Sequence, residues 1–132
     1  MTITPLYAGI LAILFFALSI RVVAMRGTGI SLGDGGNPEM LRRIRGHANF
    51  AEYVPLILLM MAFLELSHFS IYLLHGLGIA LVVGRALHGY ALSFTERFKF
   101  GRFYGTVLTF TLLNVCGILC IYQGLQAILR QA

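Results

Sequence analysis

Residues 1–20 read MTITPLYAGILAILFFALSI and contain no charged side chain. An α-helix needs about 20 consecutive apolar residues to cross the hydrocarbon core of a bilayer, so this stretch is long enough to span a membrane. Of the 132 residues in the chain, 58% are hydrophobic and only 11% are charged, whereas about a quarter are charged in an average soluble domain. A soluble protein of this size could not bury so much apolar surface, and we therefore predict an integral membrane protein.

Three more apolar runs follow the first. Together they predict transmembrane helices over about residues 3–25, 38–66, 67–94 and 103–130. The sequence Asn37-Pro38-Glu39 is typical of a helix start, since it combines a capping side chain, a proline at the first position and an acid in the first turn. The predicted fold class is an all-α bundle of four transmembrane helices, which occupies residues 1–132 as a single domain.

Basic residues are distributed unevenly between the two ends of this bundle. Eight belong to the loop between the first and second helices, the loop between the third and fourth, or their flanks: Arg21, Arg26, Arg42, Arg43, Arg45, Arg97, Lys99 and Arg102. The opposite end has only Arg130. Because Lys and Arg accumulate in cytoplasmic loops, we predict that both basic loops are cytoplasmic and that both termini lie on the other side. The net charge of +5 then indicates contact with anionic lipid rather than with nucleic acid.

Polar side chains gather near the cytoplasmic end of the second and third predicted helices. On the second helix, four of them share one face at spacings of three, four and three residues: Arg42, Arg45, Asn49 and Glu52. On the third helix, Arg85 and His88 share a face. At about 1.5 Å per residue, Glu52 and His88 both lie roughly 9 Å below the cytoplasmic ends of their helices, and Arg85 lies about one turn deeper.

Charges inside a membrane span are costly and rarely persist without a partner or a function. Because an arginine side chain can extend toward the surface, we predict an ion pair between Arg85 and Glu52. This pair either locks two helices together or belongs to a binding site. The complete set of residues favours a site, since guanidinium groups bind carboxylates and Glu52 or Asn49 can accept an amine. We therefore predict an anionic ligand with carboxylates and at least one amine, and place Arg102 at the mouth of its site.

The second helix carries the stretch RRIRGHANFAEYVP at residues 42–55. It meets the pattern R-x-x-x-N-x-x-E-Y-x-P through Arg45, Asn49, Glu52, Tyr53 and Pro55. This pattern resembles the second-helix signature of the MAPEG family, the membrane-associated proteins of eicosanoid and glutathione metabolism. The third-helix stretch GRALH at residues 84–88 is a weaker match, and the loop GDGGN at residues 33–37 is similar to the small bacterial branch. In length, number of spans and orientation, the resemblance covers the whole chain.

The resemblance implies a homotrimer in a bacterial inner membrane, with both termini periplasmic and glutathione bound as co-substrate between subunits at the cytoplasmic side. It further implies that the glutathione site contains residues from the second and third helices: Arg45, Asn49, Glu52, Tyr53, Arg85 and His88. The first helix would contribute Arg21 or Arg26. Arg102 matches the fourth-helix arginine that lies beside the thiol in several members, and is the expected catalytic residue, because a cation there favours the thiolate.

The function implied by the resemblance is that of a glutathione-dependent membrane transferase or peroxidase, similar to the microsomal glutathione transferases. Its second substrate would be a lipophilic electrophile that partitions into the bilayer. Two departures from the family pattern leave an alternative open. Leu92 stands where many catalytic members have a tyrosine, and Ala48 where some members have an arginine. The alternative is a non-catalytic protein of the same fold that binds glutathione or lipid.

Three other classes of function fit the sequence less well. A haem site needs two histidines facing each other at equal depth, but His68 falls in a turn at the far side and His75 lies well across the bilayer from His88. A small four-helix multidrug transporter relies on a carboxylate in its first helix, and here that helix has none. Cys116 and Cys120 lie four residues apart in an apolar helix, which indicates packing rather than a redox or metal role. No metal or haem cofactor is therefore expected.

Overall fold

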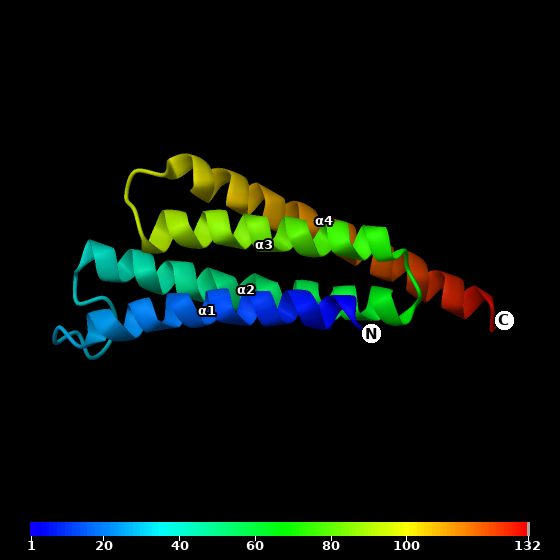
Figure 1. The fold of residues 1–132 in the computed structure, drawn as a ribbon, viewed down its shortest axis with the longest axis horizontal. Coiled ribbons are helices and arrows are strands. Elements are labelled where there is room, and N and C mark those ends of the chain that lie inside the picture. Colours follow the sequence, from blue (N-terminus) through cyan, green and yellow to red (C-terminus); the bar gives the residue numbers. More distant parts are fainter. Residues whose placement is uncertain (132) are drawn as a thin grey trace.

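A computed structural model describes residues 1–131. The described chain consists of four helices (Figure 1): α1 Ile3–Arg26, α2 Pro38–Leu66, α3 Ile71–Ser93 and α4 Lys99–Leu129. All four are long and apolar enough to cross a membrane. The α1–α2 and α3–α4 loops lie at one end of the elongated bundle, and the N-terminus and the α2–α3 turn lie at the other, beyond which the C-terminal part of α4 extends. The predicted all-α bundle of four transmembrane helices is confirmed.

Two helix starts differ from the predicted ones. The start of α2 was correct, because the Asn37 side chain caps it by accepting hydrogen bonds from the backbone N–H of Glu39 at 2.9 Å and of Met40 at 3.1 Å. However, α3 begins at Ile71 rather than at residue 67, since the chain turns at His68, which has a φ of 59°. In addition, α4 begins at Lys99 rather than at residue 103. Its first turn therefore lies within the basic segment.

Close approach of α3 and α4 near the loop end depends on Gly105. A Cβ atom at this position would lie 2.7 Å from the Gly84 carbonyl oxygen and 2.8 Å from the His88 Cβ. Because both of these atoms belong to α3 at or next to its backbone, no side-chain rotation could relieve the contact. The absence of a side chain at residue 105 thus lets α4 pack directly against the part of α3 that carries His88.

At the opposite end, Glu65 joins α2 to the start of α1. Its carboxylate accepts hydrogen bonds from three backbone N–H groups, those of Thr2, Ile3 and Thr4, the last two at 2.8 Å. These are among the N–H groups that a helix leaves without an internal partner, and a carboxylate there is favoured by the helix dipole. The contact holds the start of α1 against the end of α2.

Candidate functional site

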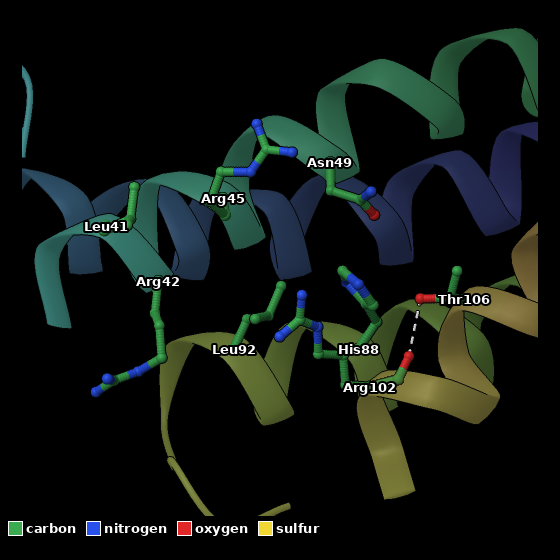
Figure 2. Close-up of a pocket in the computed structure, with 8 residues that line it drawn as sticks. All are labelled: Leu41, Arg42, Arg45, Asn49, His88, Leu92, Arg102 and Thr106. Carbon is green, nitrogen blue, oxygen red and sulfur yellow. Dashed lines mark hydrogen bonds between the residues drawn. The ribbon is translucent and has the colours of Figure 1, made fainter. Parts of the chain in front are cut away.

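A pocket of about 360 Å³ lies between α2, α3 and α4 at the end that carries the two basic loops. Figure 2 shows its eight lining residues: Leu41, Arg42, Arg45, Asn49, His88, Leu92, Arg102 and Thr106. The structure thus brings together four residues that the sequence assigned to the site, namely Arg45, Asn49, His88 and Arg102. These come from three different helices, so the bundle itself forms the pocket.

The lining of the pocket is strongly basic, with three arginines and no acidic residue. Arg42 points toward the α3–α4 loop, where it forms an ion pair with Glu96 (Figure 2). Arg45 lies at the exposed rim, and the side chain of Arg102 extends from the beginning of α4 toward α2. No cysteine lines the pocket, and residues 1–131 contain no group of three or more side chains suited to a metal ion. Because Arg45 and Arg102 form no ion pair with residues 1–131, this arrangement favours an anionic ligand.

Arg85 lies behind the pocket and is completely buried, with 0% of its surface exposed. One of its terminal nitrogens, Nη1, donates to Asn49 Oδ1 at 2.9 Å and to Thr109 Oγ1 at 3.3 Å. The other, Nη2, lies 3.4 Å from Nδ1 of His88. The guanidinium carbon is also 5.3 Å from the centre of the Phe50 ring. Arg85 therefore contacts two of the pocket residues without lining the pocket itself.

The predicted ion pair between Glu52 and Arg85 was wrong for the single subunit. Among the residues that the structure describes, Arg85 has no carboxylate partner, and Glu52 is exposed on the surface of α2. Matching depth was not sufficient, because the rotation of α2 directs Asn49 toward Arg85. Glu52 follows three residues later and lies roughly 60° around the helix from Asn49.

Three other predicted site residues lie outside this pocket. Tyr53 packs against Phe110 of α4, with the ring centres 5.3 Å apart. Arg21 donates from Nε to the Ser93 carbonyl oxygen at 2.9 Å, and its guanidinium carbon lies 4.0 Å from the centre of the Phe94 ring. Arg26 donates to carbonyl oxygens of the α1–α2 loop, Ile30, Ser31 and Gly33. Neither arginine of α1 reaches the pocket of its own subunit, because the pocket is formed by the other three helices.

Two hydroxyl groups of α4 were not predicted from the sequence as part of the site. Thr106 lines the pocket, and Thr109 is buried against Arg85. Their positions four and seven residues after Arg102 place them on its face of the helix. That spacing was a usable signal, but only Arg102 was assigned to the site from the fourth helix, whose remaining residues were predicted as an apolar span.

Comparisons with known proteins agree with the four-helix architecture. The model of the MAPEG family matches residues 4–122. The inner membrane protein YecN of Escherichia coli K12 is 36% identical over 89 residues, which cover 67% of this chain and 68% of YecN. YecN of Escherichia coli O6:H1 gives the same values. No solved structure matches. With a family match over most of its length and four helices able to span a membrane, the chain is an integral inner membrane protein and belongs to the MAPEG family.

Proposed function

We propose that this protein is a glutathione-dependent membrane transferase or peroxidase that acts on lipophilic electrophiles. The observation that carries the proposal is the pocket between α2, α3 and α4, which has three arginines and neither an acidic residue nor a cysteine in its lining. Glutathione supplies what this pocket lacks, namely two carboxylates for the guanidinium groups and a thiol for nucleophilic attack. The electrophile would reach the thiol from the surrounding bilayer.

The arginines of the pocket would serve different steps. Arg45, at the exposed rim, is placed to bind a carboxylate through its planar fork of donors. Arg102 belongs to a different helix and extends toward the centre of the pocket. A cation beside the thiol lowers its pKa and increases the fraction of thiolate, the form that attacks an electrophile. We assign carboxylate binding to Arg45 and thiolate stabilisation to Arg102.

We further propose that the site is completed in a homotrimer. Glu52 is charged, lies within a transmembrane helix and is exposed on the single subunit. A charge facing lipid is costly, which supports contact with a second copy of the chain. Arg21 and Tyr53, outside the pocket of their own subunit, would then belong to the site of a neighbour.

The alternative function is that of a non-catalytic glutathione-binding protein, and one observation favours it. Leu92 lines the pocket, and it occupies the position at which the resemblance led us to expect a tyrosine in catalytic members. An apolar side chain there cannot donate a hydrogen bond to the thiol. If Arg102 is not sufficient to stabilise the thiolate, the protein would bind glutathione without turnover.

Variants of the two arginines test the proposal. Arg45→Leu should weaken glutathione binding by about 1.5–3 kcal/mol, the contribution of a charged hydrogen bond. Arg102→Leu should retain part of the binding but lose the ultraviolet thiolate band of bound glutathione and the turnover of a reactive aryl halide. Calorimetry, difference spectroscopy and steady-state kinetics in detergent would measure the three quantities.

The matched control is Arg97→Leu, which removes the same charge from an exposed position in the α3–α4 loop outside this pocket. It should leave glutathione binding and turnover close to the wild-type values. Failure of wild-type protein to bind glutathione would refute the proposed function. Binding without a thiolate band and without turnover would instead support the non-catalytic alternative.

A further inference from the structure

The position of Arg85 is unusual because the guanidinium is fully buried and meets only neutral acceptors. Its three hydrogen-bond partners are the side chains of Asn49, Thr109 and His88. Within residues 1–131 it forms no ion pair, and its Nε has no hydrogen-bond partner. Two of its three partners, Asn49 and His88, line the pocket. Arg85 therefore contacts a bound ligand only indirectly, through these two residues.

An arginine has five N–H donors and no acceptor, and this fixes the direction of every hydrogen bond that Arg85 forms. Asn49 must turn its Oδ1 toward Arg85, which leaves the two hydrogens of its amide nitrogen on the other side. His88 must accept at Nδ1, which requires the neutral tautomer with its proton on Nε2. Thr109 cannot reverse this pattern, because its one hydroxyl proton is donated to the Gly105 carbonyl oxygen at 2.7 Å.

Asn49 and His88 extend toward each other from α2 and α3 at the inner part of the pocket (Figure 2). With their acceptor atoms turned toward Arg85, the atoms that remain to face a ligand are N–H donors: the Asn49 amide nitrogen and His88 Nε2. A protonated amine cannot bind to such a wall, because it also has only donors. A carboxylate has only acceptors and matches both residues.

We propose that Arg85 is a positioning residue that makes the inner wall of the pocket a surface of donors only, and that this wall binds a carboxylate of the ligand. The buried positive charge of Arg85 adds to the preference, since it has no carboxylate partner among residues 1–131 of its subunit. Asn49 would therefore bind a carboxylate of the ligand and not, as the sequence had suggested, its amine. The inference rests on the proposed function for the identity of glutathione as ligand, but the orientation of Asn49 and His88 holds without it.

The tautomer of His88 tests the first half of the inference. In protein with isotopically labelled histidine in lipid bilayers, correlation spectra should join the protonated nitrogen of His88 to Cδ2, which identifies Nε2–H. A His88→Gln variant assigns the signal among the four histidines. Arg85→Leu or, if that variant does not fold, Arg85→Gln should abolish the single tautomer. A proton on Nδ1 in wild-type protein, or an unchanged single tautomer in a folded Arg85 variant, would overturn the inference.

Variants of Asn49 test the second half. Asn49→Asp places acceptors toward both Arg85 and the pocket, so its melting temperature should stay at or above that of wild type, while glutathione affinity should fall at least tenfold. Asn49→Leu removes the donors without adding a charge and should also weaken binding. The control is Asn114→Leu, since Asn114 bonds only to the Phe110 carbonyl of its own helix and does not line the pocket. Wild-type affinity in both Asn49 variants would overturn the carboxylate assignment.

Blocked ligands identify the group that the wall binds. Wild-type protein should bind glutathione more tightly than glutathione in which one of the two carboxylates is an ethyl ester. In Asn49→Leu, the two affinities should be equal. An equal penalty for the ester in both proteins would contradict the inference. Glutarate, which has two carboxylates but neither amine nor thiol, separates the two proposals. If glutathione does not bind, binding of glutarate that depends on Asn49 supports the donor wall and refutes only the proposed function, whereas no binding of glutarate refutes both.

Discussion

Glu52 is the residue whose surroundings in the single subunit are least compatible with a membrane. It lies on the second turn of α2 beyond Arg45, it is exposed, and its carboxylate has no hydrogen bond or ion pair with any residue from 1 to 131. In a trimer, a cation or a ligand amine at the subunit interface would compensate this charge. We expect Glu52→Leu and Glu52→Gln to weaken trimer association by about 1.5–3 kcal/mol per lost charged contact, measured by native mass spectrometry from lipid nanodiscs on dilution.

Asp34→Asn provides the control for charge alone, because it removes one negative charge from the α1–α2 loop outside the spans. It should leave the oligomeric state unchanged. If Glu52 faced lipid instead, replacing it by leucine would stabilise each subunit and leave association intact. That result would exclude Glu52 from the interface.

The residues of the site were predictable to different degrees, for a physical reason. Helical spacing and distance from the basic loops were enough to bring Arg45, Asn49 and His88 to one pocket. They were not enough to identify the partner of Arg85, because that depends on how far each helix is rotated about its own axis. The sequence pattern of an apolar helix with few polar residues defines this rotation poorly, and Asn49 rather than Glu52 proved to face the buried arginine.

At the scale of the helices, the contact between α3 and α4 determines where His88 lies. Gly105 allows α4 to approach the α3 backbone so closely that a methyl group would overlap the Gly84 carbonyl oxygen and the Cβ of His88. We expect Gly105→Ala to destabilise the bundle by about 1–3 kcal/mol, a typical effect of overpacking. It should also weaken glutathione binding, because His88 would move away from Asn49. Unfolding in mixed detergent micelles and calorimetry would measure the two effects.

Gly117→Ala, on the same helix, is the matched control. A Cβ atom there would meet nothing within 4 Å in the subunit, so alanine should be neutral or slightly stabilising through its higher helix propensity. Similar losses in the two variants would show that the effect does not come from the α3–α4 contact.

The existence of the four helices was predictable because length and apolar composition alone determine whether a segment can span a bilayer. Two of their boundaries were not. The start of α3 depends on the backbone turn at His68, and α4 begins one turn early because Lys99 and the residues after it continue the helix outside the apolar run. Hydropathy reports where a helix enters the membrane, whereas backbone hydrogen bonds determine where it ends.

The whole molecule has a strong asymmetry of charge along its long axis. Eight basic residues belong to the end that contains both the α1–α2 and α3–α4 loops and the pocket, and only Arg130 lies near the other end. From the positive-inside preference we predict that the pocket lies at the cytoplasmic surface and that both termini lie in the periplasm. This orientation matters for the proposed function, because the site would draw glutathione from the cytoplasm while its arginines face the anionic headgroups of the inner leaflet.

Reporter fusions in a bacterial host test this orientation. Green fluorescent protein, which fluoresces only when it folds in the cytoplasm, should be fluorescent when fused after Asp34 or after Lys99 and dark when fused after Ser67 or at the C-terminus. Alkaline phosphatase, which is active only in the periplasm, should give the opposite pattern at the same four positions, so each reporter controls for poor expression of the other.

Replacing Arg26, Arg97 and Lys99 together by glutamine should lower the fraction of correctly oriented protein, because it removes three of the eight charges that favour the cytoplasmic side. An active phosphatase after Asp34 and Lys99 would place the pocket in the periplasm, and the proposed supply of glutathione from the cytoplasm would then be wrong.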